Sequence, residues 1–110
     1  MNMLLLAAGL SGALAVIAGA FAAHGASGSA AEWLKTGGQY QLAHAVAALL
    51  AAQMGLRGPG WLFVAGGAVF AGTLYLMALG LPRWLGAVTP LGGLAMIAGW
   101  LWLAWCGLRR

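Results

Sequence analysis

Charged residues are scarce in this chain of 110 residues, and only one of them, Glu32, is acidic. Charged residues make up 5% of the sequence and apolar residues 64%, whereas a soluble domain carries roughly 25% charged residues. Because this composition could not cover the surface of a soluble fold, it predicts an integral membrane protein. Cysteine is also nearly missing: Cys106 stands alone, which excludes a disulfide within the chain.

Other absences narrow the function. The five basic residues form no cluster large enough to bind nucleic acid. Too few cysteines and carboxylates accompany the two histidines to close a zinc site, and the spacings G-x-S-x-G and H-E-x-x-H are missing. We therefore expect a protein that is not an enzyme and that carries no metal or cofactor. Residues 1–6 lack the basic residues of a signal peptide, so we expect this segment to remain as the first span.

Long apolar stretches divide the chain into four candidate spans. Each has roughly the 20 residues that a membrane-crossing helix needs. Because the connections around residues 57–60 and 81–86 are short, neighbouring helices must run antiparallel. The sequence predicts an all-α, integral membrane four-helix bundle of up-down-up-down topology, formed by a single domain over residues 1–110. The spans are expected at residues 3–23, 39–55, 61–80 and 87–108.

The first connection is longer and has helix signals of its own. Ser29 and Glu32 have the spacing of a capping box, and Gly37 and Gly38 would stop the helix that it starts. This pattern predicts a short interfacial helix over residues 30–36, between spans one and two. Near the start of the fourth expected span, Thr89-Pro90 is typical of a helix start.

Basic residues give the orientation. Arg57, Arg109 and Arg110 would lie on the side of the termini, and Lys35 and Arg83 on the opposite side. Because basic residues are more frequent in cytoplasmic loops, this excess predicts that both termini are cytoplasmic. The expected location is a bacterial inner membrane.

Small residues recur at helical spacing in every span, and such stripes allow helix backbones to approach closely in lipid. We expect the stripes to pack the helices, with five glycines as the main contacts: Gly12, Gly72, Gly92, Gly93 and Gly99. Polar side chains lie on these stripes or at their ends, all toward the first and third loops. This polar cluster consists of His24, Gln39, Tyr40, Gln41, His44, Tyr75 and Thr89.

Polar groups in hydrocarbon are costly without partners, so the cluster has a few plausible roles. It could be a structural hydrogen-bond network, or a cavity in which Tyr, Gln and His orient a small ligand or a lipid headgroup. His24 and His44 could also be axial haem ligands. A small proton-coupled transporter would need His44 to replace the membrane carboxylate that small multidrug transporters use, because no span contains Asp or Glu.

Several blocks of sequence resemble the YgdD-like family of small membrane proteins, a domain of unknown function related to a small human transmembrane protein. They occur in the family's order at residues 19–25 (GAFAAHG), 36–44 (TGGQYQLAH), 70–75 (FAGTLY), 85–94 (LGAVTPLGGL) and 99–100 (GW). The resemblance covers most of the chain and implies a four-helix membrane protein, without supplying an activity. Ala22 and Thr73 stand where the family more often has glycine and serine.

The sequence thus favours a non-enzymatic membrane protein with a polar pocket at the end of loops one and three. The pocket would bind a small molecule or lipid, or the protein would support a larger membrane complex. Expected partners are membrane lipid and a homo-oligomer or larger complex, and not nucleic acid. The proton-coupled transporter is the alternative, and a haem-binding redox protein comes third.

Overall fold

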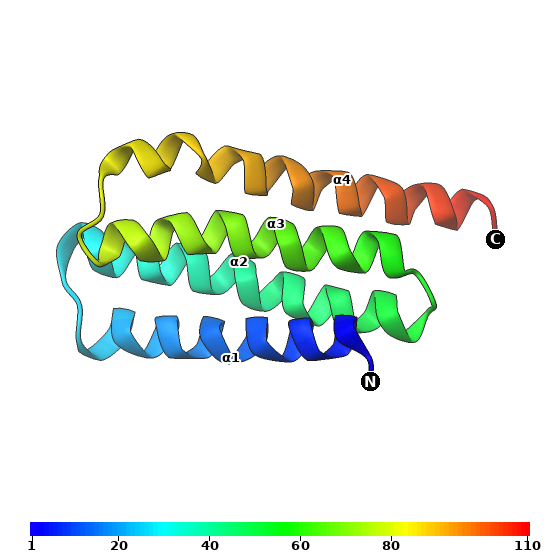
Figure 1. Ribbon diagram of the computed structural model, residues 1–110, viewed down its shortest axis with the longest axis horizontal. Helices are drawn as coiled ribbons and strands as arrows, with labels where there is room; N and C mark the ends of the chain where they lie inside the picture. Colours follow the sequence, from blue (N-terminus) through cyan, green and yellow to red (C-terminus); the bar gives the residue numbers. More distant parts are fainter.

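A computed structural model describes all residues of the chain, 1–110, and its secondary structure is entirely helical. Four α-helices follow one another in antiparallel order (Figure 1). A short 3₁₀ helix, η1, precedes the last of them. Their bounds are α1 Met3–His24, α2 Gly28–Gln53, α3 Arg57–Ala78, η1 Arg83–Ala87 and α4 Thr89–Leu108.

Three of these helices are long and apolar enough to cross a membrane: α1, α3, and α4 together with η1. The remaining helix, α2, is the longest, but its first half carries Glu32, Lys35 and several amides and hydroxyls. The expectation of an all-α membrane protein is confirmed to this extent.

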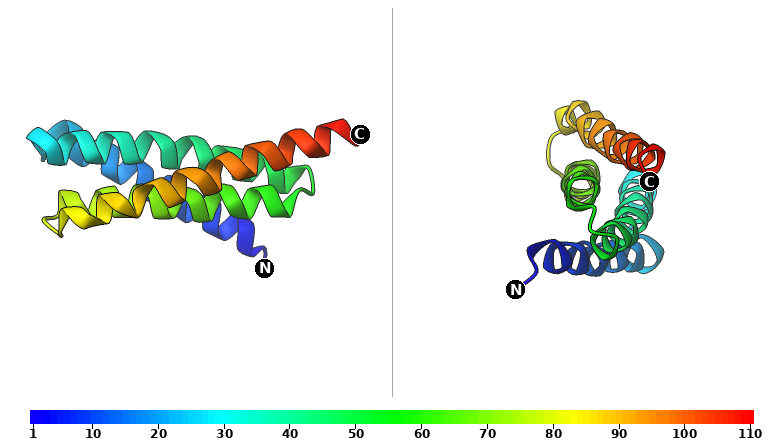
Figure 2. Two further views of the ribbon diagram at one scale, coloured as in Figure 1. Left: turned by 90° about the horizontal axis from the view of Figure 1, so that it is seen from above. Right: turned by 90° about the vertical axis from the view of Figure 1, so that its right-hand side faces the viewer.

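The helices are arranged in an open layer rather than a closed bundle. α2 and α3 form the central pair, α1 packs on α2, and α4 packs on α3. Viewed from the end, α1 and α4 lie at opposite edges of the molecule (Figure 2). A closed four-helix bundle would bring these two helices together, so the predicted bundle is not what the structure has.

Small side chains fill the interior, and large apolar ones lie outside. The core cluster contains Leu4, Phe63 and Val64 with the alanines of α1 and α2. Most Leu, Ile and Trp side chains of α1 and α4 are exposed. This distribution suits a helix layer surrounded by lipid, where an apolar exterior has no cost and close backbone packing drives association.

The predicted interfacial helix is wrong, because residues 30–36 are the first turns of α2. The helix begins at Gly28, whose φ of +60° lets the chain reverse within three residues after α1. Ser27, not Ser29, is the N-cap residue. Gly37 and Gly38 do not stop the helix: both are buried inside it, and a Cβ at Gly38 would lie 3.1 Å from the Ala15 carbonyl oxygen on α1. These two glycines allow α1 and α3 to pack closely on α2, at the place where the sequence suggested a helix end.

The start of α4 agrees better with the sequence. α4 begins at Thr89, with Pro90 in its first turn. Proline is tolerated there because the N–H groups of the first turn have no hydrogen-bond partner within the helix. Thr89 does not cap the helix; Val88 occupies the N-cap position. The Thr89 hydroxyl is used for a contact between helices instead, as described below.

Candidate functional site: polar contacts between the helices

His44 lies at the middle of the helix layer and connects α2 to α4. Its side chain is 7% exposed and is packed against the rings of Phe63 and Trp100, with centroids 5.6 and 5.8 Å away. Nδ1 lies 2.7 Å from the Tyr40 carbonyl oxygen, one turn earlier in α2. The Trp100 indole N–H donates a hydrogen bond to Nε2 at 3.0 Å.

These two partners determine the protonation of the imidazole ring. A carbonyl oxygen only accepts hydrogen bonds, so Nδ1 must carry the proton; an indole N–H only donates, so Nε2 must be unprotonated. His44 is therefore the neutral Nδ1–H tautomer when both bonds are made. Adding a proton or a metal at Nε2 would break the bond to Trp100, and a metal or haem iron at Nδ1 would break the bond to the Tyr40 carbonyl oxygen.

Gln41 and Tyr75 form a second polar contact, between α2 and α3. The Tyr75 hydroxyl donates to Gln41 Oε1 at 2.7 Å, and the Gln41 side chain is only 4% exposed. The Tyr75 ring also packs directly on Gly37: a Cβ at Gly37 would be 2.8 Å from the nearest ring carbon, which is too close. The missing side chain at Gly37 thus makes room for the ring that carries the hydroxyl.

Thr73 and Thr89 form a third contact, between α3 and the start of α4. Their hydroxyls are hydrogen-bonded to each other and both residues are buried. Thr73 Oγ1 is also 3.0 Å from the Val69 carbonyl oxygen, and Thr89 Oγ1 is 3.3 Å from that of Leu85. Every buried side-chain nitrogen and oxygen in the structure has a hydrogen-bond partner. Four of the buried polar side chains therefore connect neighbouring helices: Gln41, His44, Thr73 and Thr89.

Between α2 and α4 the surface has a groove of about 260 Å³, which we call the α2–α4 groove. Its lining is almost entirely apolar or aromatic, and His44 is at its base. The Tyr40 ring stands at its edge, 4.9 Å from the ring of Phe70, and the residue is 49% exposed. The lining residues are Tyr40, His44, Phe70, Gly93, Met96, Ile97 and Trp100.

The structure brings some of the predicted cluster together and leaves other members apart. Gln41 meets Tyr75, whereas Thr89 meets Thr73, which was not in the cluster. His24 is exposed at the end of α1, beside Phe21 and Gly25, and does not reach the other members. Gln39 is exposed on α2. One pocket shared by His24, His44 and Tyr75 is therefore not what the geometry shows.

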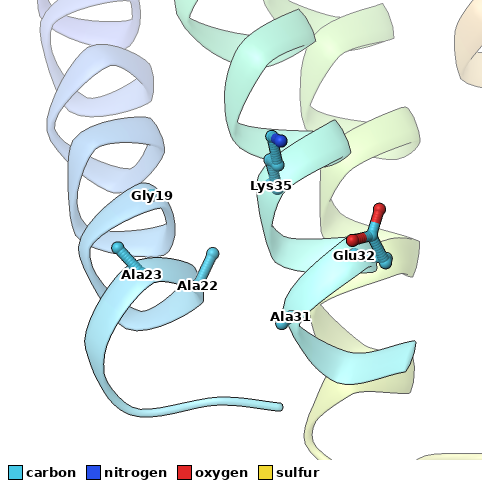
Figure 3. A pocket seen from close by; sticks show the side chains of 6 residues that line it. All are labelled: Gly19, Ala22, Ala23, Ala31, Glu32 and Lys35. Atoms are coloured by element: carbon cyan, nitrogen blue, oxygen red, sulfur yellow. The ribbon is translucent and has the colours of Figure 1, made fainter. Parts of the chain in front are cut away.

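At the end of loops one and three, where the polar pocket was expected, the recesses are of two kinds. One, of about 390 Å³, is largely apolar and lies between the end of α1, the start of α2 and the end of α3, with Phe21, Leu34 and Leu79 in its wall. The other, of about 410 Å³, lies between α1 and α2 and is lined by Gly19, Ala22, Ala23, Ala31, Glu32 and Lys35 (Figure 3). Its two charged side chains both come from α2, on an exposed part of the helix.

The five glycines expected to pack the helices divide into two groups. A Cβ at Gly92 would overlap the Phe70 amide nitrogen on α3, and one at Gly99 would lie 2.8 Å from the Phe63 ring. These two glycines are at close contacts between α3 and α4. A Cβ at Gly12 or Gly93 would meet its nearest neighbour at 4.0 or 3.9 Å, and one at Gly72 would meet nothing within 4 Å. The packing prediction is therefore wrong for Gly72, which lies beside open space.

Sequence reasoning missed two residues that complete the network. Trp100 follows Gly93 and Met96 at helical spacing, so the sequence already placed it on the same side of α4 as these two residues. Thr73 was named only because the related family more often has serine there, although its side chain carries a hydroxyl group within an apolar helix. Counting the indole N–H among the hydrogen-bonding groups of α4 points to Trp100, whereas Thr73 lies off the small-residue stripe of α3 and is marked only by its hydroxyl.

The comparisons with known proteins find relatives that are named as membrane proteins. The family described as "Protein of unknown function (DUF423)" matches residues 18–93. The UPF0382 inner membrane protein YgdD of Escherichia coli (strain K12) is 42% identical over 90% of this chain and 84% of its own length. The UPF0382 membrane proteins YwdK of Bacillus subtilis (strain 168) and SH2409 of Staphylococcus haemolyticus are 38% and 35% identical, over at least 92% of both chains. None of these names states an enzymatic activity, and no solved structure matches the chain.

Proposed function

The chain belongs to the UPF0382 family of membrane proteins of unknown function, and we propose that it is a non-enzymatic four-span protein that binds a membrane lipid in the α2–α4 groove. In this proposal α2 is the fourth span, and both termini are cytoplasmic. The single observation that carries the proposal is the groove itself: an apolar, side-opening recess at the depth of the hydrocarbon, with a tyrosine at its edge.

The lining of the groove suits an amphipathic molecule that already resides in the bilayer. Phe70, Met96, Ile97 and Trp100 offer an apolar surface for a hydrocarbon chain. Tyr40 adds an exposed phenol, whose hydroxyl can donate to a carbonyl or phosphate oxygen of the same molecule. Helical side chains lean toward the N-terminus of their helix, so the Tyr40 hydroxyl points toward the first-loop surface, where lipid headgroups lie.

Chemistry at the histidines is disfavoured by the same geometry. A proton carrier must release and regain its proton during each cycle, yet each nitrogen of His44 already has a hydrogen-bond partner. His24 lies on the outer end of α1, away from the other polar groups. The transporter and haem alternatives would both require these bonds or positions to change, so lipid binding is the simpler function.

Gly93 offers a variant that tests the groove. Its Cβ would point toward the groove with only the Phe70 ring near it, at 3.9 Å, so Gly93→Leu should fill the recess without separating the helices. We expect this variant to fold and to lose labelling by a phospholipid that carries a photoreactive group in its acyl chain. Peptides around Ile97 and Trp100 should be labelled in the unmodified protein.

Gly72→Leu is the matched control, because it adds the same side chain to α3 where nothing lies within 4 Å. It should leave the labelling of these peptides unchanged. If Gly93→Leu is labelled at the same peptides as the unmodified protein, or if the labels spread evenly over all four helices, the groove is not a lipid site.

A further inference from the structure

One face of α2 has no neighbour in the chain. α1 and α3 pack on this helix, α4 contacts it at His44, and the remaining side is open. The residues of this side recur every three or four positions and are all exposed. We call this the outer face of α2; it consists of Glu32, Lys35, Gln39, Leu42, Ala43, Val46, Leu49, Leu50 and Gln53.

The depth of the outer face follows from the contacts of α2. It rests also on the proposal above that α2 is the fourth span. Gly67 is midway along α3 and faces His44 and Gln41, which would put the middle of the membrane near residue 43 of α2. Gln39 is then one turn away, about 6 Å at 1.5 Å per residue. The hydrocarbon extends roughly 15 Å from its middle plane. The Gln39 amide therefore lies in hydrocarbon, exposed, in a lone copy of the chain.

An amide in that position is costly unless another polar group reaches it, because lipid tails offer no hydrogen bond. Two more polar features continue the same face toward the first loop. Glu32 and Lys35 are three residues apart, exposed and opposite in charge. Toward the middle, Ala43 is small enough to let another helix approach.

We propose that a second copy of this chain covers the outer face of α2, about a two-fold axis perpendicular to the membrane. The two α2 helices would run parallel, because both copies have the same orientation in the membrane. The same patch then meets itself. The side-chain N–H of each Gln39 donates a hydrogen bond to the side-chain oxygen, Oε1, of Gln39 in the other copy. Glu32 of each copy lies beside Lys35 of the other. This pairing is independent of lipid binding in the α2–α4 groove.

Disulfide cross-linking in membranes tests the arrangement. In a Cys106→Ala background, Leu50→Cys should form a covalent dimer under mild oxidation. Leu14→Cys on α1 and Leu101→Cys on α4 are controls, because these leucines are exposed to a similar extent on other helices. We expect both controls to remain monomeric. Leu50 lies about 10 Å from the middle plane, so two antiparallel copies would hold its cysteines about 20 Å apart and unlinked.

Gln39→Leu tests the chemistry of the contact. It replaces an exposed amide by an apolar side chain, so the single copy has no reason to unfold in lipid. We expect it to weaken dimerisation about tenfold, measured as the loss of Leu50→Cys cross-linking on dilution into added lipid. Gln53→Leu, at the far end of the same face, should change it little. The proposal is overturned if Leu50→Cys stays monomeric, if a control position cross-links instead, or if Gln39→Leu dimerises as strongly as Gln39.

Discussion

Gly92 and Gly93 are neighbours in sequence, yet the structure predicts opposite results when each is replaced by alanine. Both belong to the small-residue stripe of α4. A Cβ at Gly92 would overlap the Phe70 amide nitrogen and lie 2.6 Å from the Gly66 carbonyl oxygen. Both are backbone atoms of α3. A Cβ at Gly93 would have only the edge of the Phe70 ring near it, at 3.9 Å. One methyl group therefore separates two helices at position 92 and fits at position 93.

The cost at Gly92 can be estimated from these distances. An ordinary contact for a Cβ begins at 3.4 Å, so α4 must move from α3 by about 0.8 Å at Gly66 and further at Phe70. Backbone atoms cannot turn aside as a side chain can. Overpacking costs roughly 1–3 kcal/mol in a well-packed core, and the shift would also stretch the bond between Thr73 and Thr89. We expect Gly92→Ala to lose about 2–4 kcal/mol of stability.

Gly93→Ala should change the stability by less than about 0.5 kcal/mol, because surface-like substitutions without a clash lie in that range. Thermal unfolding in detergent, followed by tryptophan fluorescence, compares the two variants directly. A clearly lower Tm for Gly92→Ala with an unchanged Tm for Gly93→Ala is the expected result. Equal effects of the two substitutions would show that the α3–α4 contact is not as close as the structure has it.

Two further predictions concern the hydrogen bonds between the helices. In a double-mutant cycle of His44→Phe and Trp100→Phe, the two substitutions should couple by about 0.6–2 kcal/mol in stability toward unfolding in detergent; strictly additive effects would mean that the bond to Nε2 contributes nothing. Tyr75→Phe keeps the ring against Gly37 and removes only the donor to Gln41, so it should cost about 1 kcal/mol. Gln41→Leu combined with Tyr75→Phe should lose less than the sum of the two single changes, and a larger loss would contradict this pairing.

Helices and their order could be predicted from the sequence because in lipid they depend on length and composition. The expected spans at 61–80 and 87–108 overlap α3 and α4, and the first span agrees with α1 to one residue. The error at the second span had a physical cause. Gly37 and Gly38 stop a helix in water, where glycine loses conformational entropy, but here they stay helical because α1 and Tyr75 pack directly on them. No single-sequence signal distinguishes these uses.

The polar cluster was harder to predict than the helices, because a stripe of small residues defines a face only to within about one position. On α1 a buried face is predicted by residues that recur every three or four positions: Gly9, Gly12, Val16, Ala20 and His24. Of these, Gly9, Val16 and His24 are exposed. The buried face is one residue away, at Ala8 and Ala15. That shift of about 100° turns His24 from the interior to the surface. On α2 the same spacing predicts His44 and Ala48 to be buried, as they are, whereas Tyr40 on that stripe is exposed.

The least apolar helix lies at the centre of the layer, and the hydrogen bonds explain how it can do so. α2 carries more polar side chains than a helix surrounded by lipid could keep, but α3 and α4 supply partners for two of them, Gln41 and His44. These partners lie on two helices that follow α2 in the chain, so α2, as the proposed fourth span, should need α3 and α4 to be stable in the membrane. Gln39 is an exposed amide near the middle of α2 that receives no such partner from the chain, and this leads to the expectation that a second copy completes what three neighbouring helices leave open.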